Sequence, residues 1–318
     1  MHYDVFNGDA DGIIALVQLR LAKPQKTTLI TGVKRDIALL QQVDSSKAES
    51  VTVLDISLEK NIQALNELLT EKVNVFYVDH HRTGDVPQSG CFKTLFNTDA
   101  NTCTSLLVNE YLHGKYANWA IAAAFGDNMT KSAQQLAVKT NLTDEQTSLL
   151  AELGVYINYN GYGRTVDDLH FHPAELFKML VKFQDPLELI TEKNSVFAQL
   201  KQAYLQDMEK AQHATVLIET DYCKIVQLAD KAWARRVSGV FGNELANQSP
   251  KKAHGVLTLN NDQTYTVSVR APLNNKQGAD KICIQFPTGG GRAGAAGINQ
   301  LPQDLLEQFI QVMSNYYA

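Results

Sequence analysis

The sequence of 318 residues lacks the marks of a secreted or membrane protein. Its four cysteines, Cys91, Cys103, Cys223 and Cys283, are widely spaced and form no CxxC pair, which excludes the usual patterns for a zinc site or thiol exchange. The chain opens with MHYDVFNGDADG, in which no basic stretch precedes an apolar run. No segment approaches the roughly 18 continuous apolar residues of a membrane helix. We therefore expect a cytoplasmic protein with reduced thiols and no membrane partner.

Positive charge is also scarce. The 29 lysines and arginines are outnumbered by 34 aspartates and glutamates, which leaves a net charge of −5 with histidine neutral. Such a chain has no global basic field to hold a long polyanion through many phosphate contacts. This argues against a processive nuclease on long DNA or RNA. A small anionic substrate remains compatible, because metal ions and a few arginines can supply the positive charge locally.

No internal repeat or low-complexity tract divides the chain. Length favours two domains, and 44% apolar with 20% charged residues is an ordinary globular composition. The charged amphipathic segment 194–213 indicates a connecting helix. We expect a first domain over residues 1–190, a helical linker over 191–213 and a smaller second domain over 214–318.

Strand-like and helix-like segments alternate in the first part. The apolar runs at 3–6, 27–33, 51–57 and 73–81 favour strands, and the segments between them have helical spacing of apolar residues. This alternation predicts parallel strands joined by right-handed crossovers. Residues from 101 to about 190 are mainly helical in pattern. The expected fold class is α/β, with a parallel sheet and flanking helices in the first domain.

The second half has its own strand-like runs. They are ATVLIET, CKIVQLA, HGVLTL, YTVSVRA and KICIQF, followed by a glycine cluster and a final helix near 303–316. A separate and smaller α/β domain is the simplest interpretation.

Acidic and histidine side chains gather just after the strand-like runs of the first domain. They are Asp9 and Asp11 after the first run, Asp55 at the end of 51–57, and Asp79, His80 and His81 at the end of 73–81. The carboxyl ends of parallel strands share one edge of a sheet, so these residues can converge on one pocket. Taken singly, DADG is ordinarily a turn and an HH pair a surface loop. Their repetition favours a metal site, since carboxylates and imidazoles together suit Mn²⁺ and one carboxylate can bridge two ions.

Four short motifs resemble those of the DHH phosphoesterase superfamily. They are DADG at 9–12, the aspartate of LDIS at 55, DHH at 79–81 and GDN at 126–128, in the order and approximate spacing of that family. Far downstream, GGGRAGAAG at 289–297 resembles the GGGH..AAG signature of the C-terminal domain that accompanies the catalytic domain. VSVRA at 267–271 is similar to the strand before it. The resemblance spans essentially the whole chain and implies a catalytic first domain and a substrate-binding second domain.

The resemblance implies two divalent cations, with Mn²⁺ expected and Mg²⁺ as the alternative. The implied ligands are Asp9 and Asp55 for one ion, and Asp11, Asp55, His80 and Asp127 for the other, with Asp55 bridging. By the same resemblance His81 would face the scissile phosphate, and Asp79 would orient the loop or a ligand.

Two positions depart from the family pattern. Many members carry a ligand histidine four residues before the first motif aspartate, where this chain has Val5. RecJ-type nucleases carry an aspartate two residues before it, where this chain has Asn7, which offers a metal only a neutral oxygen. We therefore expect the first metal to be held more weakly.

The glycine cluster is a candidate for binding substrate. Gly289, Gly290 and Gly291 permit positive φ and leave their amides unshielded, so they can form an anion nest, although such a run is more often a flexible loop. Within the resemblance they form a substrate-recognition loop, in which Arg292 stands where most members have histidine.

Three further residues are candidates for contacting the substrate. Arg270 lies on a predicted strand, where a guanidinium can bind a terminal phosphate bidentately; a surface ion pair is the alternative. Asn101 and Thr104 lie in NTDANTCTS, which can begin a helix and is similar to a family segment beside the metals.

In its length and two domains the chain resembles the nanoRNase branch of the family, and it lacks the extra nucleic-acid-binding domain of RecJ-type enzymes. This implies hydrolysis of linear dinucleotides or very short oligoribonucleotides, such as pGpG or pApA, to mononucleotides. Alternatives within the class are a cyclic dinucleotide phosphodiesterase, a short single-strand exonuclease and a pyrophosphatase. The pyrophosphatase is less favoured, because that branch has a different second-domain signature. A noncatalytic nucleotide-binding protein is the alternative from another class. The acidic motif positions argue against it, while Val5 and Asn7 keep it open. The sequence leaves a homodimer open.

Overall fold

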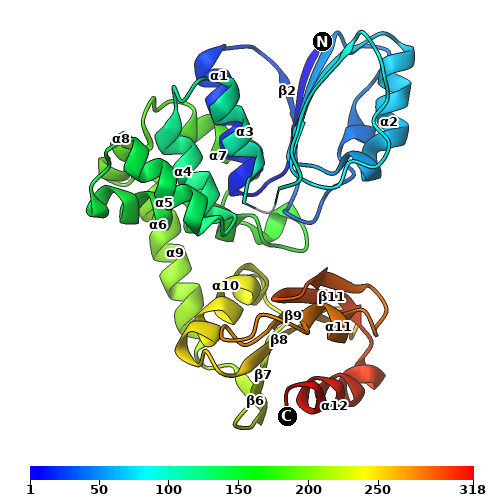
Figure 1. Ribbon diagram of the computed structural model, residues 1–318, viewed down its shortest axis with the longest axis vertical. Coiled ribbons are helices and arrows are strands. Elements are labelled where there is room, and N and C mark those ends of the chain that lie inside the picture. Colours follow the sequence, from blue (N-terminus) through cyan, green and yellow to red (C-terminus); the bar gives the residue numbers. More distant parts are fainter. Residues whose placement is uncertain (100) are drawn as a thin grey trace. The chain divides into compact units, whose positions relative to one another are not determined.

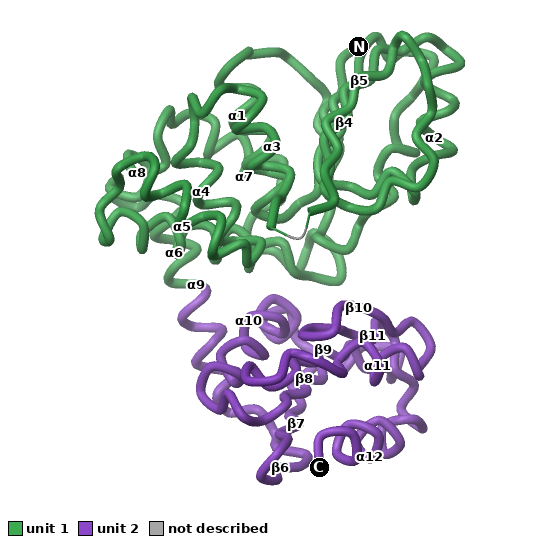
Figure 2. The backbone as a smooth tube through the Cα atoms, viewed as in Figure 1, with its two compact units in different colours: residues 1–203 green, residues 204–318 purple. Residues whose placement is uncertain are grey.

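The protein, seen in a computed structural model that describes residues 1–99 and 101–318, folds as two compact units, Met1–Ala203 and Tyr204–Ala318 (Figure 2). The boundary between them lies within helix α9 (Val196–Ala211), inside the segment 191–213. Each unit has its own sheet and its own hydrophobic core. No helix among the described residues has the length and apolar character needed to span a membrane.

The sheet of the first unit is parallel throughout. Its strands are β1 (His2–Phe6), β2 (Thr28–Ile30), β3 (Ser50–Leu54), β4 (Asn74–Asp79) and β5 (Phe92–Phe96). They lie in the order β2-β1-β3-β4-β5, and all four neighbouring pairs are parallel. The α/β fold class with a parallel first sheet is confirmed, and β5 is a strand that the sequence pattern did not reveal. In this order the connections reverse direction between β1 and β3, which is the point where open α/β sheets form their binding crevice.

Helices lie on both sides of this sheet, some against it and some packed on other helices (Figure 1). They are α1 (Ala10–Ala22), α2 (Leu58–Thr70), α3 (Thr104–Tyr111), α4 (Ala117–Gly126), α5 (Thr130–Lys139), α6 (Asp144–Asn160), α7 (Pro173–Leu180) and α8 (Pro186–Thr191), with short 3₁₀ turns at Leu40–Gln42 and Val166–Asp168. Figure 1 shows α2 on one side of the sheet and α1, α3 and α7 on the other. The side chains of Leu58, Leu65 and Leu68 on α2 pack with Val53 and Val75 of the sheet in one core. That pattern is the apolar stripe expected of an amphipathic helix.

The helices nearest the site are buried nearly all round. Residues of α1 from Ala10 to Leu19 are all buried, as are most of the small residues of α4. Helices α4 and α6 approach closely because Gly154 has no side chain: a Cβ there would lie 1.9 Å from the carbonyl oxygen of Ala122. This close packing fixes the end of α4, which is followed by Asp127.

The second unit has a mixed six-stranded sheet in the order β10-β11-β9-β8-β7-β6. Its elements are β6 (Thr215–Glu219), β7 (Cys223–Leu228), α10 (Ala232–Gln248), β8 (Ala253–Leu259), β9 (Tyr265–Arg270), α11 (Ala279–Cys283), β10 (Gly289–Arg292), β11 (Ala295–Leu301), a 3₁₀ turn at Gln303–Leu305 and α12 (Leu306–Tyr317). Only β7 and β8 pair in parallel. The expected second α/β domain is therefore present.

Two local expectations for the second unit were wrong. The run KICIQF alternates apolar and polar residues and predicted a strand, but it forms helix α11 and the turn after it. The helical path buries Ile282, Cys283 and Phe286 and leaves Ile284 73% exposed, so the burial follows helical rather than alternating spacing. The glycine cluster, expected as a loop, forms strand β10 at the edge of the sheet.

Candidate active site

The candidate site lies at the carboxyl edge of the parallel sheet, at its switch point. Asp9 and Asp11 follow β1, and Asp55 follows β3, the strand next to it. Asp55 has a φ of 60°, in the left-handed region that residues other than glycine rarely adopt. Its side chain is buried, and one of its oxygens, Oδ1, accepts a hydrogen bond from Thr104 Oγ1 at 3.1 Å. Such strain at a buried carboxylate is typical of a functional position.

Asp9 caps the first helix. Its Oδ1 accepts hydrogen bonds from the backbone amides of Asp11 at 3.0 Å and Gly12 at 3.1 Å, and its Oδ2 lies 2.5 Å from Lys34 Nζ. Burial raises the pKa of Asp9, but the charge and hydrogen bond of Lys34 outweigh it, and the pKa lies below its usual value. Gly12 is required here, since a Cβ would lie 2.3 Å from the carbonyl oxygen of Asn7.

Asp11 joins α1 to the start of α3. Its two oxygens accept the backbone amides of Thr104 and Ser105, each at 2.7 Å, and Ser105 Oγ donates to the Asp11 carbonyl at 2.8 Å. A carboxylate at a helix N-terminus satisfies amides that have no partner within the helix. Asp11 is 1% exposed.

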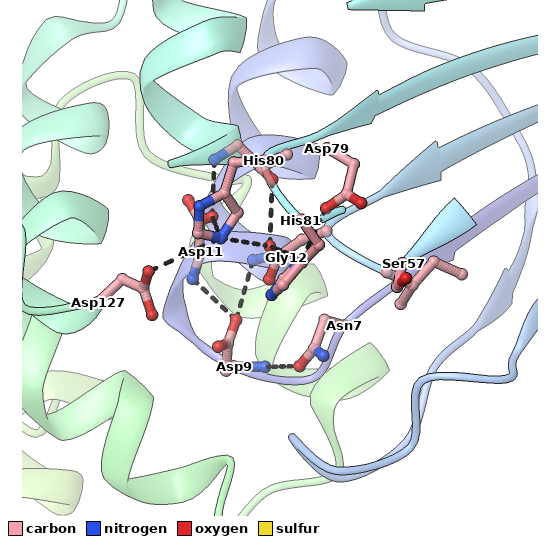
Figure 3. A network of polar contacts seen from close by, with 12 residues as sticks. Asn7, Asp9, Asp11, Gly12, Ser57, Asp79, His80, His81 and Asp127 are labelled. Atoms are coloured by element: carbon pink, nitrogen blue, oxygen red, sulfur yellow. Dashed lines mark hydrogen bonds and ion pairs between the residues drawn. The ribbon is translucent and has the colours of Figure 1, made fainter. Parts of the chain in front are cut away.

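The histidines face these carboxylates. His80 Nε2 lies 3.5 Å from Asp55 Oδ1, 3.9 Å from Asp11 Oδ2 and 3.8 Å from Asp127 Oδ2, and Figure 3 shows these groups of Asp11, His80 and Asp127 close together. His81 Nδ1 lies 2.8 Å from Asp79 Oδ1. Burial lowers the pKa of His81, but the hydrogen bond and charge of Asp79 outweigh it, so the pKa is raised.

The donor set fits a divalent cation. Ligand atoms of Asp11, His80 and Asp127 all lie within 4.8 Å of one another, and so do those of Asp55, His80 and His81. Burial and the charges of neighbouring carboxylates raise the pKa of Asp55 well above its usual value. A cluster of buried carboxylates that repel one another is stabilised by a positive ion, and carboxylate with imidazole is a set that Mn²⁺ accepts.

Neither a family model nor a curated protein sequence matches the chain. Solved structures do: exonuclease RecJ bound to manganese superposes with a TM-score of 0.61 at 15% identity, over 99% of this chain and 89% of that one. An exopolyphosphatase-related protein from Bacteroides fragilis gives 0.54 at 14% identity, with coverage of 99% and 92%. The pGpG-specific phosphodiesterase PggH from Vibrio cholerae gives 0.53 at 11% identity, with full coverage of both chains.

This chain has the fold of RecJ. The likeness extends over nearly the whole of both chains, so it includes the second unit as well as the first. It confirms the fold that the DHH resemblance implied.

Within this RecJ fold, two predicted site residues of the first unit have other partners. Asn7 Oδ1 accepts the backbone amide of Asp9 at 3.2 Å, and Asn7 Nδ2 donates to the carbonyl of Lys34 at 3.0 Å. Asn101 is exposed, and its side-chain amide donates to Asp99 Oδ1 at 3.0 Å. Thr104, in contrast, contacts Asp55 directly.

The predicted site residues of the second unit lie at the edge of its sheet. Gly289 and Gly291 allow close packing of the backbone. A Cβ at Gly289 would lie 1.8 Å from the Cys283 carbonyl oxygen, and a Cβ at Gly291 would lie 2.4 Å from the Ala296 Cα. At Gly290 a Cβ would meet no described atom within 4 Å. Arg292, at the end of β10, is exposed.

Arg270 points to helix α10 and is held by several groups. Its guanidinium donates to Asn243 Oδ1 at 2.6 Å, to Ser268 Oγ at 2.9 Å and to the carbonyls of Gly239 and Val269, each at 3.1 Å. These contacts connect β9 to α10, which is a structural task that the sequence interpretation did not foresee.

Lys34 is the residue of the site that sequence reasoning missed. It follows β2, and its ammonium contacts Asp9 and Asp127, two of the predicted ligands. The signal was available, since Lys34 stands after a predicted strand, as the acidic residues do.

Proposed function

We propose that the chain is a member of the DHH superfamily and a metal-dependent phosphodiesterase. The observation that carries the proposal is the convergence of Asp11, Asp55, His80 and Asp127 at the switch point of the parallel sheet. The shared fold with RecJ and PggH, whose described activities are on nucleic acid and on pGpG, supports it. The net charge of −5 gives the protein no global basic field that could hold a long strand, so a short linear substrate such as pGpG or pApA is favoured.

Asp11, Asp55, His80 and Asp127 would hold a divalent cation, for which we favour Mn²⁺ because an imidazole is among the ligands. A bound ion polarises a phosphate oxygen and lowers the pKa of water. RecJ has been crystallised with manganese, which agrees with this choice. The family resemblance also implies a first ion at Asp9, whose oxygens are held in this structure by two backbone amides and by the Lys34 ammonium.

His81 and Asp79 would form a proton-handling pair. Asp79 is fully buried, and its Oδ1 holds His81 Nδ1, which fixes the ring and leaves the other ring nitrogen to face the substrate. The His81 side chain is 43% exposed, as a group that meets a phosphate requires. A histidine whose pKa is raised by a carboxylate is suited to give a proton to the leaving oxygen.

We further propose that the second unit contributes to substrate binding, chiefly through Arg292 and the open position at Gly290. Arg270 keeps the role of a phosphate ligand only as a second candidate, since its guanidinium already holds Asn243 and Ser268. Arg292→Ala should raise KM about tenfold, the loss of one charge-assisted contact. Arg270→Ala should mainly lower the stability of the second unit, because it removes the contacts between β9 and α10.

The test is turnover on a panel of substrates. The purified chain is incubated with Mn²⁺ or Mg²⁺ and with pGpG, pApA, the corresponding cyclic dinucleotides and a single-stranded 20-mer, and the products are separated by chromatography. We expect mononucleotides from the linear dinucleotides and a steep fall in rate for the 20-mer. The Asp55→Ala variant, which loses a carboxylate central to the cluster, should fall to background.

The other outcomes identify the alternatives. Cleavage of the cyclic compounds in preference to the linear ones would make the chain a cyclic dinucleotide phosphodiesterase. Equal rates on the 20-mer would make it a single-strand exonuclease. Nucleotide binding without turnover in either metal would contradict the enzymatic proposal and leave a noncatalytic binding protein.

A further inference from the structure

Lys34 places a positive charge inside the carboxylate cluster. Its Nζ lies 2.5 Å from Asp9 Oδ2, 3.4 Å from Asp127 Oδ1 and 3.1 Å from Asn158 Oδ1. The Lys34 side chain is 28% exposed, and that of Asp9 is 4% exposed. An ion pair this enclosed is screened little by water, so the ammonium acts as a local cation between the two carboxylates.

The backbone holds Lys34 in this place. Its amide donates to the Gly161 carbonyl at 2.8 Å, and its carbonyl accepts Asn7 Nδ2 at 3.0 Å. The ammonium also lies 5.7 Å from the centre of the Tyr162 ring, within reach of a cation–π interaction. These contacts come from two other segments of the chain, Asn7 after β1 and Gly161 with Tyr162 after α6, so both the backbone and the side chain of Lys34 are held in place.

Asp9 has no oxygen left without a partner. Two amides of α1 occupy Oδ1, and the Lys34 ammonium occupies Oδ2. The two groups of potential ligand atoms that lie within 4.8 Å of one another, among the residues that the structure describes, include neither oxygen of Asp9. Asp11 likewise accepts two backbone amides, but Asp9 differs from it in that the Lys34 ammonium already supplies a positive charge at Oδ2.

The positions that would complete a first metal site offer no ligand. Val5 is apolar and fully buried. Asn7 uses its oxygen for the amide of Asp9 and its nitrogen for the carbonyl of Lys34. The residue that could have been a ligand thus holds the lysine in place.

We propose that the Lys34 ammonium takes the place of one of two metal ions, so that the site binds a single divalent cation through Asp11, Asp55, His80 and Asp127. This inference rests on the metal site of the proposed function. A lysine is a point charge that binds phosphate oxygens, so it can also stabilise the substrate's negative charge.

The test is the number of Mn²⁺ ions bound per chain. Isothermal titration and elemental analysis after gel filtration should give one ion for the wild-type protein. Electron paramagnetic resonance should show an isolated Mn²⁺ without exchange coupling to a second one. These readouts are independent of turnover.

Variants test whether Lys34 is the cause. The double change Val5→His with Lys34→Ala frees Asp9 and adds an imidazole, so two ions and an exchange-coupled spectrum are expected. Lys47→Ala, at a lysine 65% exposed that pairs with Asp44, is the matched control and should still bind one ion. Circular dichroism melts verify that each variant is folded.

Two coupled ions in the wild-type protein would overturn the inference about Lys34 and leave the metal-dependent phosphodiesterase intact. No bound ion in any variant would overturn the metal site itself, and the inference with it. The wild-type measurement decides the first point even if the double variant does not fold.

Discussion

Asp11 has a structural task in addition to its proposed role as a ligand, and this predicts a measurable loss of stability. Its two oxygens accept the amides of Thr104 and Ser105, each at 2.7 Å, at the start of α3. Cys103, the residue at the N-cap of that helix, contributes no side-chain cap. Asp11→Ala therefore leaves two buried amides without an acceptor.

The magnitude follows from these two bonds. Hydrogen bonds to a charged group contribute about 1.5–3 kcal/mol each, and removing a carboxylate from a repelling cluster returns about 1 kcal/mol, so the net loss should be roughly 2–5 kcal/mol. Asp11→Asn keeps one acceptor oxygen and should lose about half as much. Metal is absent from this estimate, so the measurement is made with a chelator present.

The assay is urea unfolding followed by tryptophan fluorescence. The chain has two tryptophans, Trp119 in the first unit and Trp233 in the second. In a Trp233→Phe background Trp119, which is fully buried, reports on the first unit alone. The free energy of unfolding is obtained by linear extrapolation.

Asp127 is the matched control, because it is a proposed ligand of the same ion without the structural task. Its carboxylate lies 3.4 Å from Lys34 Nζ and 3.8 Å from His80 Nε2. Burial raises the pKa of Asp127. The charge of Lys34 lowers it, but the charges of Asp11 and Asp9 raise it, and the pKa lies above its usual value. Asp127→Ala should thus change stability by less than about 1 kcal/mol while abolishing metal binding. Equal losses in the two variants, or a loss below about 1 kcal/mol for Asp11→Ala, would refute the reasoning.

Three further predictions concern other parts of the chain. Asp79→Asn should lower the pKa of His81 in the metal-free protein, because the carboxylate that raises it is gone; an unchanged NMR titration would contradict this. Burial and two nearby lysines lower the pKa of His254 to about 4. Above the ordinary value of 6.5 this histidine is neutral in both states. As the pH falls towards 4 the unfolded chain takes up a proton that the folded chain refuses, and roughly 3 kcal/mol of stability of the second unit is lost. His254→Leu should remove that share of the pH dependence in urea titrations, and an unaltered dependence would assign it to other groups. Gly154→Ala forces a methyl group to within 1.9 Å of the Ala122 carbonyl oxygen, so thermal melts should show a loss of at least about 2 kcal/mol; a wild-type melting temperature would mean that α6 shifts freely.

The sequence was sufficient to predict the gathering of the acidic residues and histidines, because that follows from topology. Parallel strands bring their carboxyl ends to one edge, so His80 meets Asp11 and Asp55 although they are far apart in the chain. Pairings between side chains do not follow from topology. The contact of Lys34 with Asp9 depends on the turn after β2, a strand of three residues whose path no local pattern specifies.

The glycine cluster illustrates a different limit. Consecutive glycines are compatible with an anion nest, a flexible loop or a strand pressed against other backbone, and composition alone does not separate these. The deciding fact is a contact: a Cβ at Gly289 would lie 1.8 Å from the Cys283 carbonyl oxygen. Likewise, a run as short as KICIQF fits both the alternating spacing of a strand and the spacing of a helix. The helix forms because it places Ile282 and Phe286 in the core.

The departures at Val5 and Asn7 and the position of Lys34 form one arrangement. A metal beside Asp9 would need further ligands, and a buried valine and an amide already bonded to Asp9 and Lys34 supply none. A buried Asp9 without a cation would in turn be costly, because burial alone disfavours its charge. Lys34 offsets that cost by its positive charge, and Asn7 holds Lys34 in place through the hydrogen bond to its carbonyl. Lys34→Ala alone therefore leaves the charge of Asp9 uncompensated, whereas a coupled change at Val5 and Lys34 also supplies a ligand for a metal ion beside Asp9.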